Sequence, residues 1–118
     1  MRFISLFTHE TSGAPPSPEM MASMTKLIED GMKAGWLIAT EGVQWGAVGT
    51  RVHQENGKVT VTDGPFTESK EVIGGYALLA APSKEAAIEL CRRFLKVAGN
   101  GTCEVHQLYE MPAGGGRR

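Results

Sequence analysis

The chain is built from blocks of apolar residues that alternate with polar and glycine-rich segments. Residues 2–8 form an apolar run, which predicts a strand buried on both faces. Residues 36–43 and 75–81 are two further runs rich in large and β-branched side chains, and each predicts another main strand. Residues 103–109 alternate between two faces and predict a last strand.

Two segments between these runs carry apolar residues at helical spacing. Ser17 can cap a first helix, Pro18 suits its first position, and Gly35 can close it in the left-handed conformation. The apolar stripe of this helix is Met20, Met24, Leu27, Ile28 and Gly31. Ser83 can cap a second helix, which Gly99 ends. The second stripe is Ala87, Leu90, Cys91, Phe94 and Leu95.

A β-hairpin is predicted between the second and third main strands. Asn56-Gly57 is a strong signal for a two-residue turn, because a type I′ turn needs positive φ at both central residues. Residues 50–54 and 58–62 are the two flanking strands. The turn fixes the register as Glu55 with Lys58, Gln54 with Val59, His53 with Thr60, Val52 with Val61 and Arg51 with Thr62.

The order of these elements predicts an α+β fold of the ferredoxin-like type. Two split βαβ units form an antiparallel sheet with both helices on one face, and the hairpin is an insertion. We expect one domain over residues 1–111 and a flexible tail over residues 112–118. Because the first strand and the strand over residues 75–81 are apolar on both faces, the face without helices needs a cover, most simply a second copy in a homodimer.

Composition narrows the class of protein. The chain has 118 residues, of which 42% are hydrophobic, and a formal net charge of -1. This balance is typical of a globular protein and argues against general nucleic-acid binding, which needs a basic surface. The apolar start of the chain is too short for a signal peptide or a membrane span. We therefore expect a cytoplasmic protein that binds neither nucleic acid nor membrane.

The two cysteines and the motif content argue against several kinds of site. Cys91 and Cys103 have no CxxC spacing and no histidine cluster beside them, so we expect a reduced, mostly buried pair rather than a disulfide or a zinc site. There is no phosphate loop, GxSxG, HExxH or EF-hand pattern. We therefore expect no metal and no cofactor.

The corner that follows the hairpin, Asp63-Gly64-Pro65-Phe66, is the first candidate site. Asp, Gly and Pro together are explained fully by a tight turn. The functional reading is that the corner holds the Asp63 carboxylate rigidly at a cleft between sheet and hairpin, as a general base requires. In that reading Gly64, Pro65, Phe66 and Lys70 contact the ligand, with Phe66 excluding water.

Two histidines are candidate partners for Asp63 in catalysis. His9 follows the first strand, where a loop is a common place for functional groups, although a solvated surface residue explains it as well. His106 lies on the polar side of the last strand and could act as an acid–base group near neutral pH. A hydrogen bond from His106 to Glu104 or Gln107 is the simpler explanation.

Three segments together resemble the YCII-related proteins of the DGPF type. They are PPSPEMM (residues 15–21), AGWLIATEGVQ (residues 34–44) and TDGPFTESKEVIGGY (residues 62–76), and the resemblance extends from Arg2 to Glu110. It implies a dimer related to the dimeric α+β barrels. The family more usually has Arg where this chain has His106, which puts an arginine-based ligand role in doubt.

The resemblance also implies two classes of function. Some relatives look like cofactor-independent lyases that act on small hydroxylated aromatic rings. A small-molecule site with acid–base chemistry at Asp63 is therefore one hypothesis. The alternative is a non-catalytic protein-interaction or regulatory module, possible in a family associated with alternative sigma factors. A dimer that binds no ligand is a third reading.

Overall fold

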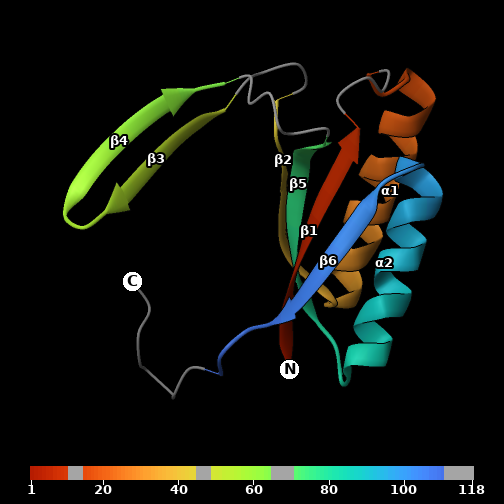
Figure 1. The fold of residues 1–118 in the computed structure, drawn as a ribbon. Helices are drawn as coiled ribbons and strands as arrows, with labels where there is room; N and C mark the ends of the chain where they lie inside the picture. The colour runs from red at the N-terminus through yellow and green to blue at the C-terminus, as the bar shows by residue number, and fades with distance from the viewer. Residues whose placement is uncertain (11–14, 45–48, 65–70, 111–118) are drawn as a thin grey trace.

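The computed structural model describes residues 1–10, 15–44, 49–64 and 71–110. Within these ranges, two helices and six strands follow one another in the predicted order (Figure 1). The elements are β1 (Arg2–Glu10), α1 (Pro18–Ala34), β2 (Leu37–Gly42), β3 (Thr50–Glu55), β4 (Lys58–Asp63), β5 (Glu71–Ala80), α2 (Lys84–Ala98) and β6 (Thr102–Gln107). In the described part of the chain, no helix is long and apolar enough to cross a membrane.

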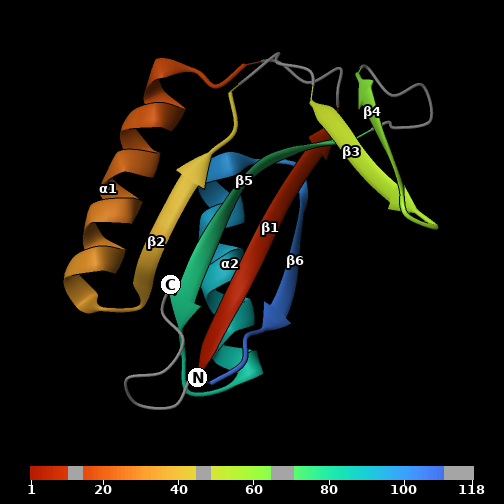
Figure 2. The ribbon, with the colours of Figure 1, turned by 90° about the vertical axis from the view of Figure 1, so that its left-hand side faces the viewer.

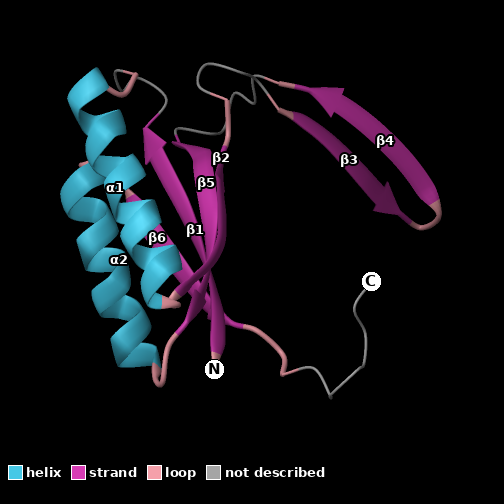
Figure 3. Ribbon diagram, turned by 180° about the vertical axis from the view of Figure 1, so that it is seen from behind, coloured by secondary structure: helices cyan, strands magenta, loops and turns pink. Residues whose placement is uncertain are grey.

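Four strands form an antiparallel sheet in the order β2-β5-β1-β6. Both helices cover one face of this sheet, and no described helix covers the opposite face, which is called the uncovered face below (Figures 1 and 2). This arrangement confirms the predicted ferredoxin-like α+β fold. Strands β3 and β4 form a separate two-stranded sheet that projects on the uncovered side (Figure 3).

Both helices begin at the predicted caps. The Ser17 side chain accepts a hydrogen bond from the backbone N–H of Met20 at 3.1 Å. Gly35 closes α1 with φ of 92°, a left-handed conformation that costs glycine little. The Ser83 side chain accepts from the backbone N–H of Ala86 at 3.1 Å and caps α2.

The predicted hairpin register is confirmed at every pair, including Val52 with Val61 and Glu55 with Lys58. Asn56 and Gly57 at its turn both have positive φ. The hairpin strands are exposed along their whole length.

The ends of the main strands differ from the prediction. Strand β1 continues to Glu10 and β5 begins at Glu71, because Glu10 pairs with Glu71 and His9 with Val72 beyond a register shift at Phe7. His9 therefore lies in a strand and not in the predicted loop. Strand β6 ends at Gln107, earlier than expected.

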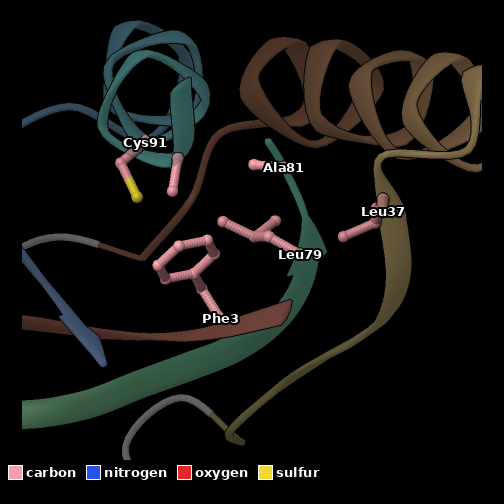
Figure 4. Packing of buried hydrophobic residues seen from close by; sticks show 6 residues of the cluster. Phe3, Leu37, Leu79, Ala81 and Cys91 are labelled. Atoms are coloured by element: carbon pink, nitrogen blue, oxygen red, sulfur yellow. The ribbon is translucent and has the colours of Figure 1, made fainter. Parts of the chain in front are cut away.

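The buried core lies between the sheet and the helices (Figure 4). Its buried hydrophobic residues are Phe3, Leu37, Leu79, Ala81, Ala87 and Cys91. Helix α1 buries only Gly31, whose Cα faces the Trp36 ring so closely that a Cβ would lie 2.7 Å from it. The rest of the apolar stripe of α1 is half-buried, so this helix does not pack fully against the sheet.

Candidate functional site

A cavity of about 810 Å³ lies between the sheet and the two helices. Its walls come from β1, β2, β5, α1 and α2, and its apolar lining includes Phe7, Met24, Leu27, Leu90 and Phe94. A volume in this range suits a small organic molecule. The cavity explains why the stripe of α1 is only half-buried, because the side chains of this stripe line a space instead of meeting the sheet.

The cavity opens at the end of the sheet where β1 ends and β5 begins. The inner lining residues Ser5 and Cys91 are buried, whereas the lining glutamates at this end are exposed. These are Glu10, Glu41 and Glu71. Thr8 donates a hydrogen bond to Glu71 at 3.2 Å. The mouth therefore carries carboxylates, whereas the interior is mainly apolar, with Ser5 and Cys91 as polar groups on its wall.

Phe7 and His9 form one wall of the cavity and pack over Gly74. A Cβ at Gly74 would lie 2.7 Å from Cδ2 of Phe7 and 2.9 Å from Cδ2 of His9, so only glycine leaves room for both rings. Phe7 also meets Phe94 of α2 edge to face, with ring centroids 5.0 Å apart. Gly74 of β5 therefore allows the Phe7 and His9 rings to pack against this strand where they line the cavity.

His9 is held at the mouth by its own strand. Its Nδ1 lies 3.0 Å from the backbone oxygen of Glu10, and its ring centroid lies 5.9 Å from that of Phe7. A carbonyl oxygen can only accept, so Nδ1 is the donor in this bond.

The other predicted catalytic residues lie elsewhere. Asp63 is exposed at the end of β4, where its carboxylate accepts a hydrogen bond from Thr50 at 2.8 Å, and the backbone N–H of Gly64 donates to Gly49 at 2.8 Å. Neither Asp63 nor Gly64 lines the cavity. The predicted ligand contacts Pro65, Phe66 and Lys70 lie outside the described residues.

His106 is on the sheet face away from the helices. Its neighbour across β1 is Ile4, and Ile4 follows Phe3, which faces the helices. His106 Nε2 lies 2.6 Å from a carboxylate oxygen of Glu104, the partner that the sequence suggested. The structure therefore does not bring His106, Asp63 and His9 together, and catalytic roles for these residues stay predictions.

Ser5 and Cys91 are two small polar groups on the wall of the cavity. Cys91 lines the inner wall and lies 3.5 Å from the hydroxyl of Ser5, and both cysteines are free thiols as expected. A side-chain hydrogen bond with Cys103 lowers the pKa of Cys91 from 9.0 to about 6; burial opposes this, and Ser5 adds to it. The same hydrogen bond, with burial, raises the pKa of Cys103.

Sequence reasoning assigned Met20 and Met24 to packing and so missed the cavity. Both are half-buried and line it, together with Met21. Several flexible thioether side chains on one helix face were the available signal, because methionine adapts to varied ligands. Among the described residues, no group of three or more His, Cys, Asp and Glu side chains is placed to hold a metal ion.

A family model described as the YCII-related domain matches residues 1–112. No curated protein matches the chain.

Proposed function

Because the chain belongs to the YCII-related family, we propose that it binds a small organic molecule in the cavity between sheet and helices, with His9 at the mouth. The observation that carries this proposal is the cavity itself, of about 810 Å³. A packed protein core leaves few voids larger than a water molecule, so a cavity of this size favours a ligand-binding site.

The lining of the cavity indicates what kind of molecule fits. Phe7, Leu90 and Phe94 offer apolar and aromatic contacts in the interior, and Met20 and Met24 can adjust to the shape of the ligand. The carboxylates of the lining lie at the mouth, and Ser5 and Cys91 are polar groups further inside. The best match is a compact molecule with an apolar or aromatic body that is held inside and a polar group that faces the mouth.

Acid–base chemistry at His9 is the finer part of the proposal. The ring is fixed by its bond to the Glu10 carbonyl and by Phe7, so it meets the requirement that a general base be rigidly placed. A neutral imidazole can abstract a proton from a ligand carbon and return it to a leaving hydroxyl. A cofactor-independent lyase needs these two proton transfers.

The binding proposal is tested with N-phenylnaphthylamine, an uncharged probe that fluoresces in apolar surroundings. We expect saturable binding of one probe per chain. Met24→Trp fills part of the cavity and should weaken binding several-fold, whereas Met32→Trp, the same change on an exposed part of α1 outside the lining, should not. No saturable binding, or equal affinity in both variants, would contradict the proposal.

The acid–base proposal has a separate test. His9→Gln keeps a hydrogen-bonding side chain but cannot shuttle a proton, so any turnover found in a screen of phenolic and hydroxy-acid compounds should fall by about 10²-fold or more. His53→Gln in the exposed hairpin is the matched control. Asp63→Asn tests the carboxylate at the corner, and loss of turnover there with His9→Gln unaffected would move the chemistry to Asp63.

We also propose that two copies pair through the uncovered sheet face. Ile38 is 44% exposed, and Ile4, Leu6 and Leu78 on the central strands are only half-buried in the single chain. A second copy would remove these side chains from water. Sedimentation should give twice the mass of the chain, and Leu6→Lys should convert it to single chains.

A protein-interaction module is the second candidate, favoured by the hairpin. Val52, Val59 and Val61 share one of its faces and are 70%, 54% and 65% exposed. The effect of Val61→Lys on the homodimer is compared with that of Thr60→Lys, which changes the opposite face of the hairpin. If the valine change leaves the homodimer intact and the cavity binds no probe, the hairpin is free to contact another protein and this candidate replaces the first.

A further inference from the structure

One buried polar side chain lies on the inner wall of the cavity. Ser5 is 5% exposed and is the one buried polar residue in the part of the chain that the structure describes. It follows Phe3 by two residues on β1, so its side chain shares the face toward the helices, and it lines the cavity. A hydroxyl in an apolar wall costs stability unless it is hydrogen-bonded. The partners of Ser5 therefore indicate what this position can do.

The hydroxyl proton of Ser5 is available to a ligand. Cys91 of α2 donates its thiol proton to the Ser5 oxygen at 3.5 Å. A hydroxyl can accept and donate at the same time, and its proton rotates to suit the partner. The cross-strand neighbours of Ser5 are Ala77 and Val105, whose side chains have no acceptor. Because sulfur is a weak acceptor, an oxygen atom of a ligand is the better partner for the Ser5 proton.

A second hydroxyl on the cavity wall has a different position in the hydrogen bonding. Thr40 of β2 is half-buried and lines the same cavity, but it donates to the backbone oxygen of Tyr76 at 2.8 Å. The proton of Thr40 is therefore used within the sheet, where it links β2 to β5. Ser5 has no such bond to the backbone in the described part of the chain, so the two lining hydroxyls differ in what they offer a ligand.

We propose that Ser5 is the inner anchor of the cavity and donates a hydrogen bond to the carbonyl oxygen of an aromatic ketone or aldehyde. This inference rests on the small-molecule site proposed above and specifies the class of its ligand. A carbonyl oxygen only accepts, so it brings no proton that would need an acceptor in this apolar wall. A carboxylate would be buried without a counter-ion, because no Lys or Arg is among the described lining residues.

The place of Ser5 on β1 determines how the ligand lies. Phe7 and His9 follow on the same face of the strand and also line the cavity, and the four residues from Ser5 to His9 span about 13 Å. A ligand whose carbonyl is held by Ser5 therefore lies along the Phe7 ring, with its other end toward His9 at the mouth. Ser5 fixes the position of the ligand and takes no part in proton transfer.

The direct test compares 2-acetylnaphthalene with 2-ethylnaphthalene, which has nearly the same shape but no oxygen. Each competes with N-phenylnaphthylamine at pH 5, below the pKa of Cys91, so that the thiol keeps its proton and does not take that of Ser5. Ser5→Ala should weaken the binding of 2-acetylnaphthalene about tenfold and leave that of 2-ethylnaphthalene unchanged or tighter. Thr40→Val, the matched control, should not change the ratio of the two affinities. An equal effect of Ser5→Ala on both ligands, or the same change of ratio in Thr40→Val, would overturn the proposal.

Two further measurements separate Ser5 from its neighbour. Cys91→Ala removes the sulfur and keeps the hydroxyl, so the ratio of the two affinities should stay that of the wild type, and its loss would assign the donor to Cys91 instead. In the wild-type chain the infrared carbonyl band of bound 2-acetylnaphthalene should lie below its position in cyclohexane, and a band at the cyclohexane position would overturn the proposal without any variant. Failure of N-phenylnaphthylamine to bind overturns the small-molecule site as well, whereas a bound probe with an unchanged ratio in Ser5→Ala overturns only the role of Ser5.

Discussion

Replacing Gly74 with alanine tests whether Phe7 and His9 are packed as tightly as the geometry indicates. The new Cβ would lie 2.7 Å from Phe7 and 2.9 Å from His9, whereas carbon atoms prefer about 3.5–4.0 Å. Both rings must therefore move by roughly 1 Å. The backbone itself is not strained, because Gly74 is not among the residues with positive φ.

Two effects of opposite sign determine how much Gly74→Ala changes the stability of the protein. Overpacking of this kind costs about 1–3 kcal/mol, and exchanging glycine for alanine inside a strand returns about 0.5–1 kcal/mol. We expect Gly74→Ala to be less stable by about 1 kcal/mol, which lowers Tm by about 4 °C or more for a domain of this size. Because the displaced rings line the cavity, the affinity for N-phenylnaphthylamine should also fall.

Two neighbouring glycines provide the scale for this measurement. A Cβ at Gly42 would meet its nearest atom at 3.7 Å, an ordinary contact, so Gly42→Ala should be neutral or slightly stabilising. A Cβ at Gly75 would lie 2.6 Å from the backbone oxygen of Glu41, which cannot rotate away, so Gly75→Ala should be the most damaging. Thermal unfolding of the three variants gives the order, and a Gly74→Ala protein as stable as Gly42→Ala would refute the reasoning.

Three further predictions concern the stability of the fold. Phe3 is 2% exposed, so Phe3→Ala should cost about 3–5 kcal/mol in urea unfolding, and a loss under 1 kcal/mol would mean that the core is not closed. The Ser83 hydroxyl accepts a hydrogen bond from a backbone N–H at 3.1 Å, so Ser83→Ala should lower the free energy of unfolding by about 1 kcal/mol. An unchanged free energy would mean that water replaces the cap. Between pH 6 and pH 9 the unfolded chain keeps a proton on Cys91 that the folded chain has released, so this residue's stabilisation is full near pH 9 and is lost as pH falls toward 6. The excess Tm of the wild type over Cys91→Ser should grow across that window, and a constant difference would contradict the shift.

Local signals predicted much of the fold. The register of the hairpin follows from Asn56-Gly57 alone, because a two-residue turn fixes every pair on either side of it. Ser17 and Ser83 mark the helix starts for the same reason, since a cap depends on a few neighbouring residues. The pairing of His106 with Glu104 was also predictable, because residues two apart in a strand share a face.

Features that depend on distant parts of the chain were not predictable in this way. The early start of β5 at Glu71 depends on the extension of β1 to Glu10, and no local pattern shows that the two segments meet. Helical spacing identifies the inward face of α1 but not how far that face lies from the sheet. Met24 therefore looked the same as a core residue until the cavity was seen.

The most direct test of the proposed cavity is a methyl NMR spectrum of the full chain during titration with N-phenylnaphthylamine. If the probe occupies the space between sheet and helices, the methyl signals of Met20, Met24 and Leu27 shift together and saturate, while those of Val59 and Val61 in the hairpin do not move. Shifts confined to the hairpin or to Ile4 and Leu6 on the open sheet face would contradict the account.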